Sequence, residues 1–436
     1  MKYVVVVSLI LSALFARGQN FEPCHTNQYI DYLETQYPGI KAHMDEQYHK
    51  SLSGVKASQQ HGKIFPIDTT YVIKVVFHIV YRTPDQNLDD ALILEQMEVL
   101  NECFNRQNAD TVNTRDIFKP IAGSARMRFE LADVNPDGKA TTGITRTQTS
   151  VTTFNTFNRG TSFDYVKQTS RGGVDAWDTD KYLNVWVCNL DFTNGRLGLF
   201  GYAYPPTGAD FWQSNVFQSK ERQGVVLHYE IVGRNNPASL PATTYTNEKT
   251  AVHEFGHFFG LRHIWGDGGC NVDDFIDDTP LASGATSGCP NGRNTCGLDN
   301  LPDQIENYMD YGSAACSNMF TEEQIRVVRY NLVNLRPGLA TPEYVYPPVP
   351  EIGKNHLYPN PVTDKQLRFF DENLIDVDVK LELTNMLGQP VLEQTAFKSD
   401  YIVEFNQIDL AAGMYYAVLT VNGEVMESGM FLIADK

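Results

Sequence analysis

The 436-residue chain is too long for one ordinary domain, so a large unit with accessory segments is expected. A formal net charge of −18 argues against binding to nucleic acid or anionic lipid, because such surfaces need clustered Lys and Arg. The sequence has no GxxxxGK phosphate loop, so no nucleotide cofactor is expected, and no apolar run approaches the roughly twenty residues that span a bilayer.

Residues 1–18 have the pattern of a secretory signal peptide. Lys2 gives the positive start, a mostly apolar stretch runs from Tyr3 to Ala16, and small residues flank Arg17 at the cleavage positions. A buried helix is the alternative, which the extreme N-terminal position disfavours. We therefore expect export through the periplasm to the cell surface or the medium.

Residues 19–60 form a polar segment with several His and Gln residues and only weak periodicity. These features favour a pro-peptide or a flexible lead-in over an element of the core. We therefore predict a pro-peptide over residues 19–60.

Residues 61–338 have the pattern of a mixed α/β unit. Residues 71–81 are rich in β-branched and aromatic side chains, as strands are, and residues 88–105 carry apolar side chains at helical spacing. Further strand-like runs, bounded by Gly, Pro, Asn or charged residues, cover 181–190, 198–205 and 224–233. We expect a sheet packed on helices.

The chemistry is concentrated in HEFGHFFGLRH, residues 253–263, after a segment in which Thr246 or Asn247 could cap a helix. On that helix His253 and His257 lie one turn apart on one face, where both imidazoles can reach a single zinc ion at about 2.1 Å. The spacing therefore predicts a zinc helix.

Gly260 permits a left-handed turn that ends the helix and presents His263 as the third zinc ligand. Glu254 lies next to the ligand face, where it can act as general base toward a zinc-bound water whose pKa the metal lowers toward about 7. Three histidine ligands leave one position open for that water. Such a site hydrolyses peptide bonds, whereas histidines that merely satisfy a helix bundle would leave the ligand spacing unexplained.

Seven cysteines in an exported chain suggest disulfides. Four of them follow the metal motif closely and could form two bridges in any of three pairings: Cys270, Cys289, Cys296 and Cys316. The odd total leaves at least one cysteine of the monomer unpaired.

Cys24 lies only a few residues into the exported chain. We propose that its thiolate occupies the open zinc position until the pro-segment is removed, as a cysteine switch. A disulfide with Cys103 or Cys188, or an incidental free thiol, is the alternative.

Residues 339–355 are rich in proline and predict a semi-extended linker. A new domain is expected from His356 onward. Three of its stretches alternate apolar and polar residues between turn signals, as short strands of a β-sandwich do: 357–364, 383–391 and 408–433.

Over roughly residues 70 to 335 the sequence resembles the metzincins and, within them, the pappalysin-type family. HEFGHFFGLRHIWGD (253–267) looks like that family's zinc helix, and NYMDY (307–311) is similar to its Met-turn. Three upstream stretches also look familial: LNECFNRQN (100–108), DGKATTGITRTQT (137–149) and LNVWVCNL (183–190). The resemblance implies a twisted mixed sheet with a zinc helix behind it, an irregular lower subdomain, and a substrate cleft between the two.

The resemblance also implies roles for single residues. Met309 would form an apolar floor beneath the metal, and Tyr311 would stabilise the oxyanion of the tetrahedral intermediate. The family's usual pairing implies the disulfides Cys270–Cys296 and Cys289–Cys316.

Members of the family bind calcium in the loop after the third histidine. The stretch NVDDFIDDTP (271–280) clusters carboxylate oxygens that suit this ion, whereas a solvated acidic loop is the alternative. The candidate calcium ligands are Asp274, Asp277, Asp278 and Thr279.

The sequence departs from its relatives at Ala315. Family members that cleave before arginine have an aspartate at this position, at the base of the S1′ pocket, where a carboxylate would pair with the guanidinium. We expect Ala315 to weaken any preference for Arg at P1′, unless Asp310 or another acid replaces the missing group.

Residues 356–436 resemble the C-terminal sorting domain of proteins exported by the Bacteroidetes type IX secretion system. This likeness implies the type IX and sortase machinery as partners, and a binding module is the alternative.

Two functions of different classes follow. The first is a secreted, zinc-dependent endopeptidase, made as a zymogen, that acts on proteins or peptides. The second is a zinc-containing adhesin or binding protein whose site has lost activity. The intact Glu254 favours the peptidase, because a degenerate site would be expected to lose its base or a ligand.

Overall fold

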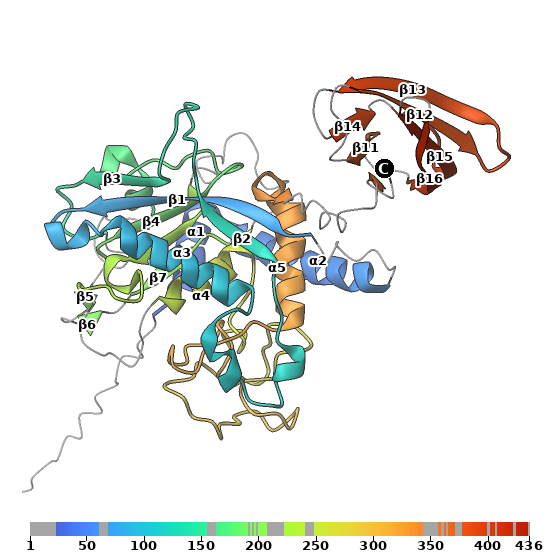
Figure 1. The fold of residues 1–436 in the computed structure, drawn as a ribbon. Helices are drawn as coiled ribbons and strands as arrows, with labels where there is room; N and C mark the ends of the chain where they lie inside the picture. The colour runs from blue at the N-terminus through green and yellow to red at the C-terminus, as the bar shows by residue number, and fades with distance from the viewer. Residues whose placement is uncertain are drawn as a thin grey trace, which may run out of the picture. The chain divides into compact units, whose positions relative to one another are not determined.

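The computed structural model forms two compact units, Met1–Tyr344 and Val345–Lys436, which are described separately (Figure 1). In the first unit the described residues are 23–60, 69–154, 163–190, 192–193, 196–197, 199–206, 222–239 and 248–342. In the second unit they are 356–358, 362, 365–370, 377–398, 402–405, 408–421 and 424–434. The predicted signal peptide and the predicted helix caps Thr246 and Asn247 lie outside these residues.

The first unit is built on a seven-stranded mixed sheet whose main strand order is β2-β1-β4-β8-β7. Its strands are β1 Tyr71–Tyr81, β2 Met127–Leu131, β3 Ile144–Gln148, β4 Leu183–Cys188, β7 Gly201–Ala203, β8 Val225–His228 and β9 Thr341–Pro342, and β5 Phe192–Thr193 pairs separately with β6 Arg196–Leu197. Strand β1 pairs in parallel with β2, β3 and β4, whereas β9 is antiparallel to it. Strand β7 lies antiparallel to β8 at one end of this order.

Among the described residues, five α-helices accompany the sheet: α1 Thr26–Gln36, α2 Ile40–Gln60, α3 Asp90–Phe104, α4 Lys249–Phe258 and α5 Glu322–Leu335. Short 3-10 helices lie in the connections: η1 Pro84–Gln86, η2 Ala109–Asn113, η3 Lys119–Ile121, η4 Tyr165–Lys167, η5 Thr169–Arg171, η8 Tyr229–Ile231 and η9 Pro337–Leu339. The mixed α/β architecture agrees with the expectation from the sequence.

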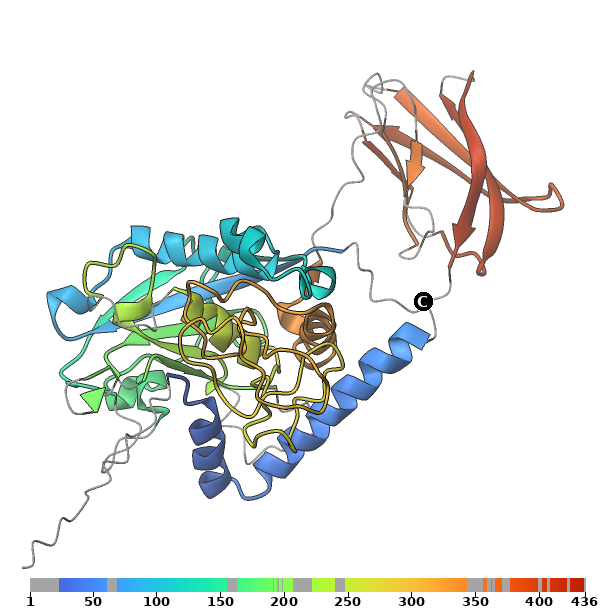
Figure 2. The ribbon, with the colours of Figure 1, turned by 90° about the horizontal axis from the view of Figure 1, so that it is seen from below.

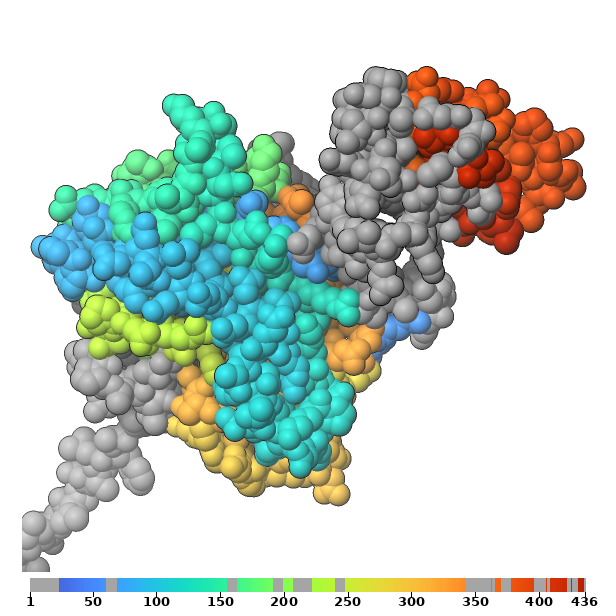
Figure 3. Space-filling model, viewed as in Figure 1, coloured from blue at the N-terminus to red at the C-terminus, as the bar shows by residue number. Residues whose placement is uncertain are grey.

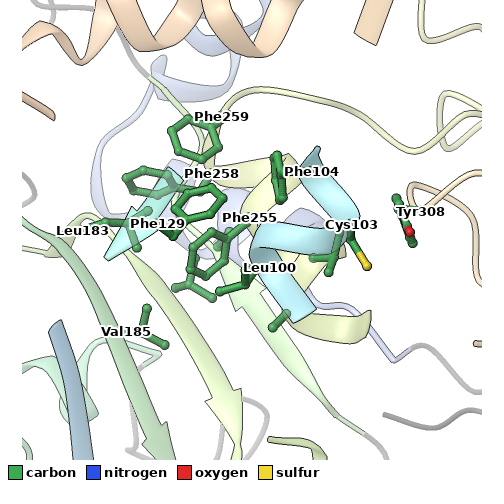
Figure 4. Close-up of a cluster of buried hydrophobic side chains, with 14 of the residues drawn as sticks. Leu100, Cys103, Phe104, Phe129, Leu183, Val185, Phe255, Phe258, Phe259 and Tyr308 are labelled. Atoms are coloured by element: carbon green, nitrogen blue, oxygen red, sulfur yellow. The ribbon is translucent and has the colours of Figure 1, made fainter. Parts of the chain in front are cut away.

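Aromatic side chains pack α4 against α3 and the sheet (Figure 4). Phe129 of β2 lies with its ring centroid 5.1 Å from Phe104 of α3 and 5.3 Å from Phe255 of α4. Burying an aromatic side chain of this size contributes about 1.5–3 kcal/mol, so this core fixes the position of α4 firmly. The residues that α4 carries on its other face are therefore held in place.

The prediction that residues 19–60 lack a core role is wrong. Helices α1 and α2 form a hairpin, shown in dark blue and blue in Figure 2, and Tyr29, Leu33 and Ile40 are fully buried against the first unit. The residues at 40, 44, 48 and 55 are apolar at nearly helical spacing, and this signal was outweighed by the many polar neighbours.

Three predicted strands are shorter than expected. The run 181–190 contributes β4, the run 198–205 contributes only the three residues of β7, and in 224–233 the strand β8 ends where η8 begins. The predicted linker 339–355 begins inside ordered structure, because Thr341 and Pro342 of β9 pair with Val72 and Tyr71 of β1.

Between α4 and α5, where every residue is described, the chain forms turns and isolated bridges without a helix or strand. Two disulfides, Cys270–Cys296 and Cys289–Cys316, cross-link this region, with Cα atoms 5.5 and 5.8 Å apart. These are the pairings that the family resemblance implied. In Figure 3 the region, coloured yellow to orange, forms the lower surface of the first unit.

The second unit contains two antiparallel sheets, as predicted for a β-sandwich. Strands β10 His356–Tyr358, β11 Leu367–Phe370 and β14 Ile402–Phe405 form one sheet, and β12 Val377–Asn385, β13 Pro390–Lys398, β15 Gly413–Val421 and β16 Glu424–Ile433 form the other. Buried side chains from both sheets, including Phe369, Leu381 and Leu419, form one core. In neither unit is any described helix both long and apolar enough to cross a membrane.

Candidate metal centre

Helix α4 carries three of the residues that the motif singled out. His253, Glu254 and His257 are all buried, with at most 6% of each residue exposed. A Cβ atom on Gly256 would collide with Sδ of Met309, so this glycine allows the 307–311 segment to lie directly against the helix. The predicted Met-turn is therefore brought beneath the histidines.

Gly260 turns the chain after α4. Its φ of +95° lies in the left-handed region, and a Cβ atom there would collide with the amide of Asn331. The same amide donates to the Phe259 carbonyl at 2.8 Å and holds the turn in place. His263 then returns to the helix as the sequence predicts.

The three imidazoles meet at their Nε2 atoms. His257 Nε2 lies 3.0 Å from His253 Nε2 and 3.1 Å from His263 Nε2. Ligand atoms about 2.1 Å from a tetrahedral zinc ion are about 3.4 Å apart, so the observed spacing is close to that of a ligand set.

Hydrogen bonds on the other side of each ring fix the tautomers. The Nδ1 atoms of His253 and His257 lie 2.6 Å from the Tyr308 carbonyl and 2.8 Å from the Leu261 carbonyl, and Nδ1 of His263 lies 2.7 Å from Asp267 Oδ1. Because a carbonyl only accepts, the first two rings must donate from Nδ1.

With Nδ1 protonated, a neutral imidazole presents a lone pair at Nε2. Burial lowers the pKa of His253 to about 3 and that of His257 well below its usual range, so both rings stay neutral. Lone pairs that point at one another repel unless a cation lies between them. The chemistry of this donor set therefore fits zinc.

Glu254 lies beside this cluster with one carboxylate oxygen engaged and the other without a partner. Its Oε2 accepts from Thr26 Oγ1 at 3.2 Å and from the Cys24 thiol at 3.6 Å, whereas buried Oε1 has no hydrogen bond within the described residues. Burial raises the pKa of Glu254 to about 8.

Cys24 joins the three histidines in one group whose ligand atoms all lie within 4.8 Å of one another. Cys24, Cys103 and Cys188 are all free and buried, so the alternative of a disulfide to Cys24 is not observed. The backbone beside Cys24 pairs with strand β7, since the His25 amide donates to the Gly201 carbonyl at 3.1 Å.

Tyr311 lies beside the histidines, and Met309 lies against Gly256 of α4. The Tyr311 ring centroid is 5.6 Å from His253 and 5.0 Å from His263, and its hydroxyl donates to the Cys24 carbonyl at 3.2 Å. Met309 is fully buried under α4.

A pocket beside Glu254 is lined by residues that include Pro23, Phe200, Lys249, Asp310 and Ala314. The predicted pocket residue Ala315 is exposed and is not part of this lining.

The ammonium of Lys249 donates to Asp110 at 2.6 Å and to the carbonyls of Ala314 and Ser317 at 2.7 Å each. Lys249 thereby holds the loop that contains Ala315.

The four predicted calcium ligands lie in one loop, but their carboxylates do not converge as the histidines do. Asp274 Oδ1 accepts from Thr279, Asp277 is ion-paired with Lys56 of α2 at 3.0 Å, and Asp278 accepts from the Glu323 amide. Buried Oδ2 of Asp274 and Oδ1 of Asp278 have no partner within the described residues. The only described group of converging His, Cys, Asp or Glu ligands is the one around Cys24.

Several functional contacts were not predicted. Thr26 binds Glu254, Asp267 orients His263, and the Trp265 ring stacks on His263 with centroids 4.4 Å apart. The spacing His263 to Asp267 is a detectable signal, because a carboxylate commonly supports a metal-bound histidine.

Two stretches of the chain match known families. Residues 167–333 match the Peptidase_M43 family, described as pregnancy-associated plasma protein-A, and residues 356–431 match the secretion system C-terminal sorting domain. An extracellular metalloprotease from Arthroderma benhamiae is 32% identical over 283 residues, which cover 64% of this chain and 78% of that protein.

Two solved structures from Tannerella forsythia are also similar. Mature mirolysin in complex with a cleaved peptide is 41% identical, with a TM-score of 0.55 over 62% of this chain and 96% of that one. A promirolysin mutant is 35% identical, with a TM-score of 0.61 over 73% of this chain and 97% of that one.

Proposed function

This chain belongs to the pappalysin-type family of extracellular metalloproteases and is a metalloendopeptidase, and from that premise we propose that it uses zinc held by His253, His257 and His263. The observation that carries the proposal is the convergence of three Nε2 atoms beside the buried carboxylate of Glu254. Zinc bound there would supply a Lewis acid and lower the pKa of a water toward about 7.

Glu254 is the proposed general base. It would take a proton from the attacking water and deliver it to the leaving amine. Tyr311 would donate its hydroxyl to the negative charge that develops on the peptide carbonyl oxygen. In the structure that hydroxyl binds the Cys24 carbonyl, so it becomes available only when Cys24 leaves.

The chain is proposed to be made as a zymogen in which residues 19–60 block the site. Cys24 lies among the histidines, and the backbone of Pro23 and His25 is hydrogen-bonded to Phe200 and Gly201 at β7, an edge to which a peptide substrate could also pair. The promirolysin structure covers about a tenth more of this chain than the mature enzyme does, which is close to the length of residues 19–60.

The sorting-domain match makes this a secreted or cell-surface protein. We propose export through the periplasm under a signal peptide at residues 1–18. The type IX secretion and sortase machinery would then recognise residues 356–436. The domain boundaries at residues 61, 338 and 355 are part of the same proposal.

Calcium is proposed for the loop 271–280. The main support is Asp274, whose Oδ2 is buried without a partner and whose pKa is raised well above its usual range by burial. A buried carboxylate with one oxygen unpaired among the described residues is costly, and a bound cation would stabilise its charged form. Asp277, Asp278 and Thr279 are the other proposed ligands.

The test is hydrolysis of a random peptide library by the activated full-length protein. We expect cleavage that a chelator abolishes and added zinc restores. An inactive zinc-binding adhesin, the competing function, would bind the metal and cleave nothing. Metal content measured on the same samples separates an inactive site from an empty one.

A further inference from the structure

Tyr29 of α1 inserts into a pocket made of aromatic side chains on the first unit. It is fully buried, and its ring centroid lies 5.2 Å from Phe163, 5.1 Å from Tyr202 and 5.7 Å from Tyr204. The pocket thus surrounds the phenol ring of Tyr29 with three other aromatic rings at contact distances.

The phenol hydroxyl lies between two buried charged groups. It donates to Asp164 Oδ1 at 2.6 Å and accepts from Lys167 Nζ at 3.2 Å. The side chains of Asp164 and Lys167 are completely buried, and Arg222 adds a second ion pair to Asp164 at 3.1 Å. A donor and an acceptor are therefore built into the floor of the pocket, matched to a hydroxyl group.

The ammonium of Lys167 is also enclosed by rings. Its Nζ lies 4.6 Å from the Tyr29 centroid and 5.4 Å from the Trp186 centroid. Burial raises the pKa of Tyr29 well above its usual range, so the phenol remains a donor. If Tyr29 leaves, Asp164 loses a hydrogen bond of 2.6 Å, and Lys167 loses both a hydrogen bond and a cation–π contact.

This pocket and the metal centre lie on opposite faces of the edge strand β7. Side chains alternate across a strand: Gly201 faces Glu254, whose Cγ would lie 2.9 Å from an added Cβ, and Tyr202 faces the pocket. The pro-segment follows the same edge, with Pro23 in the pocket beside Glu254 and α1 leading away from it. Pro23 and Tyr29 flank Cys24 in the sequence, so the Tyr29 pocket lies across Cys24 from the pocket beside Glu254, which we take as the S1′ pocket because Asp310 and Ala314 line it.

We propose that removal of the pro-segment opens this pocket, and that it then binds a tyrosine side chain of the substrate on the amino-terminal side of the cleaved bond. The proposal rests on the proposed function, in which residues 19–60 are removed. Tyrosine is favoured over phenylalanine because a bound phenylalanine would leave Asp164 and Lys167 each with one hydrogen bond fewer in a buried site.

The first test measures binding without catalysis. The full chain is cut between α2 and β1, the pro-segment is separated, and calorimetry follows binding of a peptide of residues 25–37, which lacks the Cys24 thiol. We expect the Tyr29→Phe peptide to bind at least about tenfold more weakly, whereas a Tyr37→Phe peptide, matched in the loss of one hydroxyl, binds like the parent. Equal affinity of the parent and Tyr29→Phe peptides, or no binding by the parent, overturns the proposal.

The second test measures cleavage. Library peptides should be cut faster with Tyr than with Phe at one position before the scissile bond, and Lys167→Met should bring this ratio toward one. Lys181→Met, which removes an exposed lysine, is the matched control and should keep the ratio. If Lys167→Met does not fold, the parent profile alone decides, and the absence of any tyrosine preference overturns the proposal. A processed protein that binds the peptide but cleaves nothing would contradict the proposed function. It would still support the proposal that this pocket binds tyrosine.

Discussion

The Cys24 thiol lies 3.6 Å from the Glu254 carboxylate although 230 residues separate them in the sequence. The thiol is also within ligand distance of the three histidines, so one residue of the pro-segment meets both the proposed base and the proposed metal ligands. We therefore expect access of water and substrate to Glu254 to depend on the departure of Cys24.

Replacement of Cys24 by Ala tests this relationship. We expect the uncleaved Cys24→Ala precursor to be at least about tenfold more active than the parent, because about 1.4 kcal/mol of binding to the site is enough for that factor. Activity is measured before any processing, with the chain length checked by mass spectrometry. Cys103→Ala, which removes another buried free thiol, serves as the control.

A Cys24→Ala precursor as inactive as the parent would contradict the switch. Latency would then rest on the backbone of Pro23 and His25, which is paired with β7.

Asp267 should strengthen zinc binding by orienting His263. Its Oδ1 lies 2.7 Å from His263 Nδ1, and loss of such a partner typically weakens metal binding by about 10- to 100-fold. We expect Asp267→Ala to lower zinc affinity by that factor, measured by competition with a chelator. Asp137→Ala, at an exposed carboxylate, should have no effect, and equal affinities of the two variants would contradict the role of Asp267.

The sequence predicts the residues of the metal centre better than it predicts what surrounds them. The spacing of His253, Glu254 and His257 follows from helix geometry and is readable directly. The acceptors that fix the histidine tautomers are backbone carbonyls of Tyr308 and Leu261, which no side-chain pattern marks.

The packing of residues 23–60 against the rest of the first unit is not predicted from the sequence for a different reason. The helices of this segment bury Tyr29 and Leu33 against a surface formed by distant strands, so their stability comes from tertiary packing rather than from their own polar composition.

The shortness of β8 likewise follows from the turn into η8, where the Glu230 amide donates to the His228 side chain.

The second unit is expected to act in export. Truncation after residue 350 should leave a folded, active peptidase, because the chain divides into two compact units close to that point. The truncated protein should accumulate inside the cell, as judged by fractionation and by activity of each fraction. Normal amounts in the medium or on the cell surface would argue for a binding module instead.

Ala315 is expected to limit cleavage before arginine. Ala315 is exposed and outside the lining of the pocket beside Glu254, so this prediction rests on the family resemblance, which implies a carboxylate at this position as the partner of a P1′ arginine. Ala315→Asp should move the P1′ profile of a peptide library toward basic residues by about tenfold or more, whereas Ala315→Asn, similar in size but uncharged, should not. A parent enzyme that already cuts almost solely before Arg would refute this, and Asp310, which lines the pocket, would be the alternative partner.

Glu254→Ala tests the central claim most directly, with Glu254→Gln as the variant that keeps the shape of the side chain. The account predicts that both variants bind zinc like the parent, because the three imidazoles are untouched, while peptide hydrolysis falls at least about a hundredfold through loss of the base. Zinc content and the hydrolysis rate are measured on the same processed samples. Near-normal hydrolysis by a zinc-loaded Glu254→Ala enzyme would contradict the account.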